Sequence, residues 1–435
     1  MKILKKNFLS ALISFLMIGS IHANKLVVTS TADNETSPTN GMLRYFVNIA
    51  TNSDTITFNV KKVTLVATIS IKKGVNIDGS GMGSVNIDGN KVCQVFNIAV
   101  SFDLVYLKGL NIINGYNNKT DKAFGGGMAL NAGFVNAFIE NCTFQDNEVV
   151  ADGTADGKGG AVYSRGGEYR NCFFLNNKVT GTSATNSTGG VFGSEDTFIN
   201  CVFSGNSAKK DGALLENSKS KVYNCTFFDN KVTENGVAGA MILLSSEVVN
   251  CIFHNNTQAG GSINNVLFSV GTTVSFCAME STNKQVGLND NIGLTASPFK
   301  GGTGNDKFRL AANSPCINKG TDVGIEVLEK DIVGKKRIFD GAIDMGAFEY
   351  SSSVNNKEVL VDTDFQISPN PTSSNLLISG LNDIVNTSVF DSTGRLVLET
   401  NDTNNSVNIS ALENGIFVLK VKTKFGIATR LFIKY

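Results

Sequence analysis

Few residues of this chain have the types and spacing that acid–base chemistry needs. Cleavage of a polysaccharide requires a pair of carboxylates, or a carboxylate with Lys, Arg or His, on one face of the fold. Beyond the first 23 residues the one histidine is His254, and the one adjacent acidic pair in the repeated region is Glu195-Asp196. Neighbouring side chains of a strand point to opposite faces, so this pair is a poor acid–base couple. We therefore expect no catalytic residues, and we expect His254 to be a solvent-facing strand residue.

The eight cysteines are a second candidate for chemistry, because thiols form disulfides and bind metals. Six of them recur at one position of a repeat, at intervals of 24 to 30 residues, and Cys93 and Cys316 lie outside it. No histidine accompanies them at ligand spacing, which argues against a zinc site. Stacked neighbours would have parallel Cβ vectors, which makes the disulfide dihedral awkward. We expect no metal site, and buried free thiols that pack as small apolar residues.

The repeat is the pattern Asn-Cys-x-Phe-x-x-Asn, which occurs five times, and Phe276-Cys277 looks like a degenerate further copy. Short alternating segments and small-residue turns between the copies predict one solenoid turn per repeat, about 4.8 Å from the next. Alternation places the Cys and Phe of each copy inside. The same alternation predicts that the residue two positions before the first Asn of each copy also points inward. These residues are Ile139, Tyr169, Phe198, Val222 and Val248. The sequence thus predicts an all-β fold, a parallel β-helix solenoid.

The repeated Asn residues have a mechanical explanation. Asn tolerates the left-handed backbone conformation that a tight bend requires. Amides stacked in successive turns can also donate and accept hydrogen bonds along the stack. We expect two asparagine ladders that fix the bends, and a binding role for them is the alternative.

The front of the chain indicates export. Lys2, Lys5 and Lys6 precede an apolar run, residues 8–18, and small residues follow at a plausible cleavage point. We interpret residues 1–23 as a signal peptide, because the run is well short of the ~20 residues that span a bilayer. A membrane anchor is the alternative. The formal charge of the whole chain is zero, which gives no electrostatic footprint for nucleic acid.

Residues 24–350 would form the solenoid with its ends. An open solenoid end must be covered, and residues 42–50 have Leu43, Phe46, Val47 and Ala50 on one helical face. We expect this helix to cap the first turn. No segment after residue 23 is long and apolar enough to cross a bilayer.

One row of residues that point outward from the predicted solenoid is a candidate contact surface. The residues just before the first Asn of each copy start with Glu140 and Arg170, which we expect to pair across adjacent turns. In the later copies the residue at this position is apolar, and further apolar residues follow on the strand after the next bend. This candidate contact strip consists of Phe173, Ile199, Val202, Tyr223, Val249 and Ile252. We hypothesise that it contacts a glycan or a partner. The alternative is that the longer loops 180–188 or 230–237 cover it.

The repeats and small-residue turns resemble those of right-handed parallel β-helix proteins of bacterial surfaces, namely polymorphic outer-membrane proteins and related adhesin-like proteins. Segments such as Ser314-Pro315-Cys316 and Asp344-Met345-Gly346-Ala347-Phe348-Glu349 are similar to the terminal segment of such chains. The resemblance covers about residues 25–350. It implies the fold but no one activity, because adhesins, pectate lyases and polygalacturonases share that fold.

The tail is a different module. Residues 351–363 are a polar linker, and residues 364–435 have the pattern of a small C-terminal β-sandwich. Three segments of the tail closely resemble the type A C-terminal sorting domain of the type IX secretion system. The motif positions are Pro369, Asn370, Pro371, Asp391, Gly394, Gly415 and Lys434. The resemblance implies a Bacteroidota-type bacterium, passage through the periplasm, export, and removal of the tail. A carbohydrate-binding or spacer sandwich is the alternative.

Two functions are compatible with this organisation. The first is a secreted or surface-attached, adhesin-like scaffold that binds a glycan or a protein, with the secretion machinery as a second partner. The second is a polysaccharide lyase or glycoside hydrolase of the β-helix class, although the absence of Trp weakens a sugar-stacking cleft. We expect no cofactor, because no acidic loop has a convincing ligand pattern, and calcium is suggested by fold analogy alone.

Overall fold

The structure is a computed structural model in which the chain divides into two compact units, residues 1–350 and 351–435. It describes residues 23–100, 103–131, 136–183, 188–209, 214–216, 219–234, 241–259, 266–268, 271–338, 341–350, 365–381, 383–400, 405–423 and 427–435. The predicted signal peptide, apart from Ala23, and the predicted linker 351–363 lie outside the described residues.

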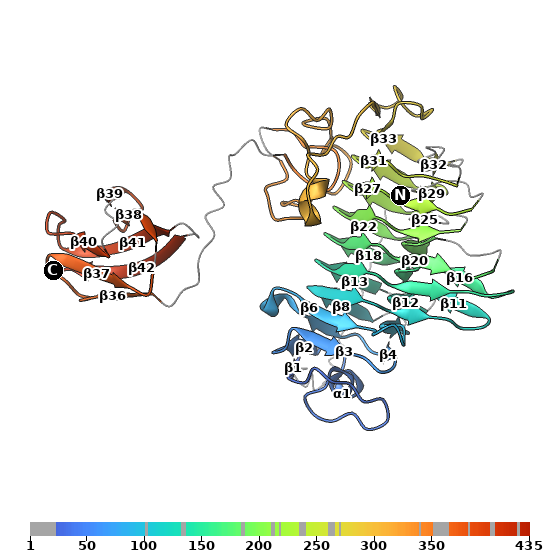
Figure 1. The fold of residues 1–435 in the computed structure, drawn as a ribbon, viewed down its shortest axis with the longest axis horizontal. Helices are drawn as coiled ribbons and strands as arrows, with labels where there is room; N and C mark the ends of the chain where they lie inside the picture. Colours follow the sequence, from blue (N-terminus) through green and yellow to red (C-terminus); the bar gives the residue numbers. More distant parts are fainter. Residues whose placement is uncertain are drawn as a thin grey trace, which may run out of the picture. The chain divides into compact units, whose positions relative to one another are not determined.

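The first unit is a solenoid of parallel strands in which successive turns add strands to the same two long sheets, A and B (Figure 1). Sheet A contains β1 (Lys25–Val28), β2 (Thr55–Phe58), β5 (Asn76–Asp78), β8 (Leu104–Lys108), β13 (Asn136–Glu140), β18 (Gly167–Arg170), β22 (Thr197–Ile199), β26 (Lys221–Tyr223), β30 (Glu247–Val249) and β33 (Thr273–Ser275). Sheet B follows around the next bend with β3 (Lys62–Thr64), β6 (Val85–Asp88), β9 (Leu110–Ile113), β14 (Thr143–Gln145), β19 (Phe173–Leu175), β23 (Val202–Ser204), β27 (Thr226–Phe228), β31 (Ile252–His254), β34 (Ala278–Glu280) and β35 (Ile292–Leu294).

Three further sheets complete the turns: sheet C has eight strands, whereas sheets D and E are confined to some of the turns. Sheet C contains β4 (Ile69–Ile71), β7 (Phe96–Ile98), β12 (Met128–Leu130), β17 (Val162–Tyr163), β21 (Val191–Gly193), β25 (Leu214–Glu216), β29 (Met241–Leu243) and β32 (Val266–Phe268). Sheet D contains β10 (Tyr116–Asn117), β15 (Glu148–Val150), β20 (Lys178–Thr180), β24 (Ser207–Ala208) and β28 (Lys231–Val232). Sheet E contains β11 (Lys122–Phe124) and β16 (Asp156–Lys158). The predicted all-β parallel solenoid is confirmed.

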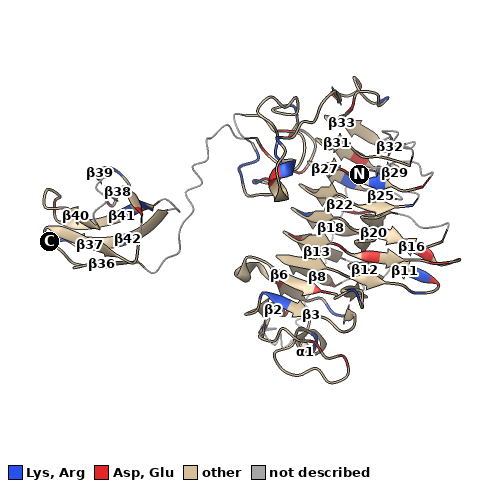
Figure 2. Ribbon diagram, viewed as in Figure 1, with Lys and Arg blue, Asp and Glu red and all other residues tan. Residues whose placement is uncertain are grey.

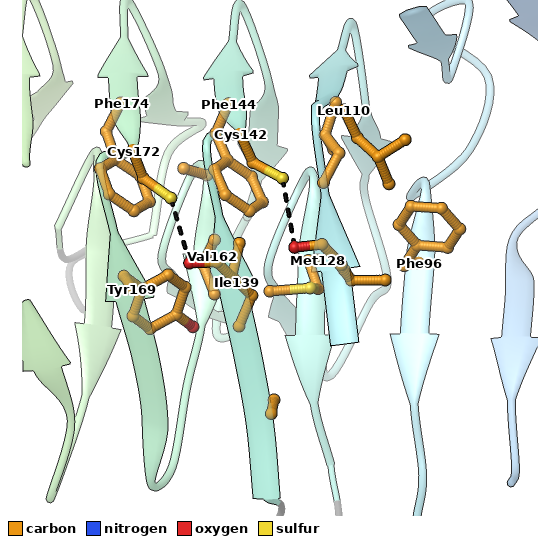
Figure 3. Close-up of a cluster of buried hydrophobic side chains, with 14 of the residues drawn as sticks. Phe96, Leu110, Met128, Ile139, Cys142, Phe144, Val162, Tyr169, Cys172 and Phe174 are labelled. Carbon is orange, nitrogen blue, oxygen red and sulfur yellow. Dashed lines mark hydrogen bonds between the residues drawn. The ribbon is translucent and has the colours of Figure 1, made fainter. Parts of the chain in front are cut away.

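The core is built from the rows that the alternation predicted. The repeated Phe side chains form a continuous stack, with centroids 5.1 Å apart between Phe144 and Phe174 and 4.5 Å apart between Phe174 and Phe203. The cysteines beside them are buried and free. Figure 3 shows the Cys142 and Cys172 thiols pointing at backbone carbonyls of the preceding turn, those of Leu107 and Ile139. Burial raises the pKa of the Cys142 thiol to about 12, so this thiol is a packing group rather than a reactive one.

The asparagines form two ladders, each with its own role. The first Asn of each repeat turns the chain from sheet A to sheet B in the left-handed conformation, with φ near 53° at Asn141 and 54° at Asn200. The second Asn is buried, and its amide bonds to the next turn, as from Asn177 Nδ2 to Asn206 Oδ1 at 2.9 Å. At this second bend the left-handed residue is the one before the Asn, such as Asn176. The second ladder therefore satisfies buried backbone groups rather than supplying the bend conformation.

The first end of the solenoid is covered by a helix, and the chain after the last strand runs back along the side of the solenoid. The helix α1 (Leu43–Ile49) buries Leu43, Phe46 and Val47 on the first turn, as predicted. After β35 the chain continues as the cover segment, which we define as residues 299–350, and this segment includes the 3₁₀ helix η2 (Gly304–Phe308). A second 3₁₀ helix, η1 (Ser80–Met82), follows β5. The cover segment (orange in Figure 1) runs back beside sheets A and B and lies next to β22, β27 and β31.

The second unit is a small antiparallel sandwich. One sheet has the order β36 (Gln366–Ser368), β37 (Asn375–Ser379) and β40 (Ser406–Asn408). The other has the order β39 (Leu396–Thr400), β38 (Ile384–Phe390), β41 (Gly415–Thr423) and β42 (Ile427–Lys434). The inner faces of the two sheets share one apolar core that includes Leu376, Phe417 and Leu419. The predicted C-terminal β-sandwich is thus confirmed.

Candidate functional site

The predicted contact strip is not a surface. Ile199, Tyr223 and Val249 lie on neighbouring strands of sheet A with at most 4% of each side chain exposed. Ile325 and Leu328 of the cover segment pack on them. Because these side chains are buried, they cannot meet a glycan or a partner in this state, and the hypothesis is wrong for them.

The part of the strip on sheet B is covered in the same way. Val202 packs with Phe308 and Phe348, and Ile252 is equally buried. Phe173 is half-buried at the border of the cover segment and also lines a groove. Among the described residues, most of these covering contacts come from residues 299–350. Residues 184–187 and 235–237 of the two loops that we considered as a cover lie outside the described residues.

The first asparagine ladder anchors this segment. Asn200 Nδ2 donates to the Lys330 carbonyl at 2.9 Å, and Asn250 Nδ2 donates to the Thr321 carbonyl at 2.7 Å. The Gly346 N–H donates to the Asn250 carbonyl at 2.7 Å. Gly346 has φ +90°, and a Cβ there would lie 2.6 Å from Ile252 Cδ1. The bend residues therefore also hydrogen-bond the cover segment to the covered turns.

A buried charged cluster stabilises the last part of the cover segment. Arg337 is fully buried, its Nη2 donates to the Gly346 carbonyl at 2.6 Å, and its Nε lies 3.2 Å from Glu349 Oε1. Asp331 and Asp344 complete the cluster, so that one cation faces three carboxyl groups. Burial raises the pKa of Glu349 to about 8 and also raises the pKa of Asp344. The cluster is enclosed by the protein, which makes it a structural fastening rather than a catalytic centre.

On the earlier turns of the same two sheets the described part of the cover segment reaches only the border, and two shallow grooves lie there. The first, which we call the charged groove, has a volume of about 450 Å³ between β13, β18 and residues 328–334. Glu140 and Arg170 line it in register, but their ion partners differ from the prediction. Glu140 pairs with Lys108 at 3.4 Å, and Arg170 pairs with Glu326 of the cover segment at 2.7 Å. Both charges are thus engaged within the protein.

The second groove, which we call the amide groove, crosses sheet B and has a volume of about 420 Å³. Its lining is dominated by amide and hydroxyl side chains on neighbouring strands. The lining residues are Asn86, Asn111, Ile113, Asn114, Thr143, Gln145, Asp146, Phe173, Leu175 and Asn305. Asn305 belongs to η2, so the cover segment forms one wall of this groove.

The amides of this groove are held in fixed orientations. Asn111 Nδ2 donates to Asn86 Oδ1 at 2.8 Å, and Asn114 Nδ2 donates to Asp88 Oδ1 at 3.1 Å. Gln145 Nε2 donates to Asp146 Oδ2 at 2.8 Å. Asn111 Nδ2 also donates to Ser84 Oγ at 3.2 Å, so this residue offers its carbonyl oxygen, whereas Asn114 and Gln145 each still have a second N–H and a carbonyl lone pair to offer. The arrangement can therefore bind a ligand that is rich in hydroxyl groups, because each hydroxyl both donates and accepts.

The residues first considered for chemistry are dispersed in the structure. Asp196 is buried, where it accepts hydrogen bonds from Ser164 and from the Gly167 N–H, whereas Glu195 lies at a left-handed bend. His254 is half-buried, with Nδ1 3.0 Å from Glu280 Oε1. Burial alone would raise the pKa of Glu280, but hydrogen bonds from His254 and Asn255 outweigh it and lower this pKa.

Charges of both signs are interspersed along the solenoid (Figure 2). Among the described residues, no group of three or more His, Cys, Asp or Glu side chains could hold a metal ion. Within the same part of the chain, no helix is long and apolar enough to cross a membrane.

In the second unit, the motif positions form two fixed turns. Asn370, between Pro369 and Pro371, accepts from the Ile433 N–H at 2.9 Å and donates to the Leu431 carbonyl at 3.2 Å. This clamp holds the start of the domain against the last strand. Lys434 pairs with Gly415 in the register of β41 and β42.

The second turn joins β38 to β39. Asp391 accepts from the Thr393 hydroxyl at 2.6 Å and from the Arg395 N–H at 3.1 Å, and Gly394 takes φ +83°. These hydrogen bonds, that of Thr393 above all, lower the pKa of Asp391 to about 2. The motif residues of this turn therefore shape the hairpin.

Comparison with known proteins identifies the tail. Residues 366–434 match the family model described as "Secretion system C-terminal sorting domain". The predicted type IX sorting domain is thereby confirmed, and the chain is an exported protein that is secreted or attached to the cell surface. The sorting domain also implies an interaction with the secretion machinery.

The solenoid has less specific similarity. A search of the curated proteins gives no match. Among solved structures, the chain is similar to the "Crystal structure of pectate lyase Pel9A" at 17% identity, with 76% of this chain and 98% of that chain covered and a TM-score of 0.33. Likeness at this level carries no argument about what the chain binds or cleaves.

Proposed function

We propose that the exported chain is an adhesin-like scaffold of a Bacteroidota-type bacterium, and that it binds a neutral glycan along the amide groove. The observation that carries the proposal is the row of Asn, Thr and Gln side chains across sheet B, of which Asn111, Asn114 and Gln145 are oriented by hydrogen bonds. Neutral amides suit sugar hydroxyls because they offer both donors and acceptors without the cost of desolvating a full charge. The rigid strands beneath them hold these side chains in place before the ligand arrives.

Binding without cleavage is the better reading of this groove. The one carboxylate in its lining, Asp146, is hydrogen-bonded by Gln145. Cleavage of a glycosidic bond requires a second carboxylate across the scissile bond or a base beside it. The lining residues of the amide groove supply neither. A lyase or hydrolase would have to use residues elsewhere on the chain.

The test is a glycan array probed with the purified chain, followed by incubation with each bound polysaccharide. We expect binding to neutral polysaccharides and no new reducing or unsaturated ends. Parallel assays with calcium and with a chelator test whether binding requires this ion. New chain ends, or the absence of any binding, would overturn the proposal.

A further inference from the structure

The sorting domain has an apolar outer face that its own fold does not explain. On β41, Phe417, Leu419 and Val421 point into the core, and the residues between them point outward. The outward positions near one end of the sheet are apolar on all four strands. We call this set the outer apolar patch: Phe390, Leu396, Ile416, Val418, Leu431 and Ile433.

Strand register makes the patch continuous. Ile416 pairs with Ile433, and Val418 pairs with Leu431, across β41 and β42. Phe390 pairs with Val418 on one side and with Leu396 on the other. Ile416 is 58% exposed, Leu431 63%, and Ile433 and Leu396 46% each. Single exposed apolar residues are ordinary, but a contiguous set on one face of a sheet marks a contact surface.

The position of the patch identifies its partner. The patch lies beside the hairpin of Asp391 and Gly394 and beside the paired ends at Gly415 and Lys434, which are motif positions of the sorting domain. At the other end of the outer face, β41 continues with Lys420 and the exposed Lys422. Apolar centres with charged borders are typical of docking surfaces.

We propose that the outer apolar patch is the surface through which the sorting domain docks onto a protein of the secretion machinery. The partner would present an apolar surface with an acidic border that faces Lys422. The inference rests on the sorting-domain match and on this exposed face, and it is independent of glycan binding by the solenoid.

The test follows export of the full chain in a host that carries the type IX machinery. The variant Leu431→Ser with Ile433→Ser keeps the inward residues and removes two exposed members of the patch. The control is Leu377→Ser, since Leu377 is 55% exposed but belongs to β37 of the other sheet. We expect the double variant to accumulate in the periplasm with about tenfold less protein outside the cell, as the loss of central docking residues implies. We expect the control to be exported like the wild type.

Two further measurements keep the result interpretable. Thermal unfolding of the purified chains checks that the substitutions leave the domain folded, and Ile416→Ser repeats the test on β41 if the double variant does not fold. Normal export of a folded patch variant would overturn the proposal. So would equal loss of export in the Leu377→Ser control. Light scattering that shows a wild-type dimer, a monomeric patch variant and normal export would assign the patch to a second copy and would likewise overturn it.

Discussion

One position of sheet A has different chemistry on neighbouring turns of the same solenoid. The residue that ends the strand is charged on β8, β13 and β18 and apolar on β22, β26 and β30, although all six strands share one register. These residues are, in order, Lys108, Glu140, Arg170, Ile199, Tyr223 and Val249. The change coincides with the cover segment, which packs on the apolar residues. The outward residues of this solenoid therefore indicate which turns are covered and which are available to a ligand.

Among these variants we expect the largest loss of stability from a substitution of Arg337, which should release the cover segment. Arg337→Met leaves the carboxyl groups of Asp331, Asp344 and Glu349 buried without their cation, which we expect to destabilise the docked segment by about 3–5 kcal/mol. Limited proteolysis of residues 299–350 measures the loss. The matched control is Lys336→Met, because Lys336 is the exposed neighbour of Arg337. Equal protease resistance in the Arg337 variant would contradict the fastening role.

Exchanging the residue types between a covered and an uncovered turn tests whether the cover segment requires an apolar residue at this position of sheet A. Ile199→Lys places a charge under Ile325 and Leu328, and we expect it to cost about 3 kcal/mol because the ammonium group would be buried without a partner. Lys108→Ile makes the reverse change on an uncovered turn and should stay within about 1 kcal/mol. Calorimetric unfolding of both variants compares them. Similar losses in the two would mean that the cover does not distinguish these turns.

The pH dependence of the covered region should be set by Glu349. Its pKa is about 8 in the folded protein against an ordinary value of 4.5. The folded state therefore holds a proton that the unfolded state releases, and stability falls as the pH rises from 4.5 to about 8. The slope is at most about 1.4 kcal/mol per pH unit.

Protease resistance of the cover segment across this pH range measures the slope. Glu349→Gln should flatten it, whereas the exposed Glu326→Gln on the same segment should leave it unchanged. A slope that persists in the Glu349 variant would place the titrating group elsewhere.

The interior of the solenoid was predictable because every turn repeats the same physical requirement. Strand alternation and stacking assign Cys142, Phe144 and Ile139 to the core, and the same argument holds at each copy. The motifs of the tail were equally informative, since their order along the chain resembles a known sorting domain.

The cover was not predictable in the same way. Residues 299–350 contain no repeat, and their contacts join positions far apart in the chain, as between the Ala347 N–H and Thr226 Oγ1 at 3.0 Å. No local pattern reports such a pairing. The sequence alone therefore leaves two interpretations of the apolar outward row open, a contact surface or a row under a loop, and it does not identify residues 299–350 as the cover.

The amide groove was missed for a different reason. Asn86 and Asn111 occupy the same position of two similar short segments, Val85-Asn86-Ile87 and Leu110-Asn111-Ile112, but these segments are not copies of the Asn-Cys-x-Phe-x-x-Asn repeat, and the register of β6 and β9 shows that they pair. The available signal was a polar residue at the outward position of two successive strands. Such a polar residue can be assigned to a binding site only once the order in which the turns stack is known.

We expect glycans to bind in the amide groove, on turns of sheet B that the cover segment leaves accessible. The most direct test is calorimetric titration of the full chain with the glycan selected on the array, using Gln145→Ala and Asn111→Ala. The control is Asn131→Ala, which removes an exposed amide directly after β12 on sheet C. We predict about tenfold weaker binding for each groove variant, roughly the loss of one hydrogen bond, and unchanged binding for the control. Unchanged affinity in both groove variants would contradict glycan binding in the amide groove.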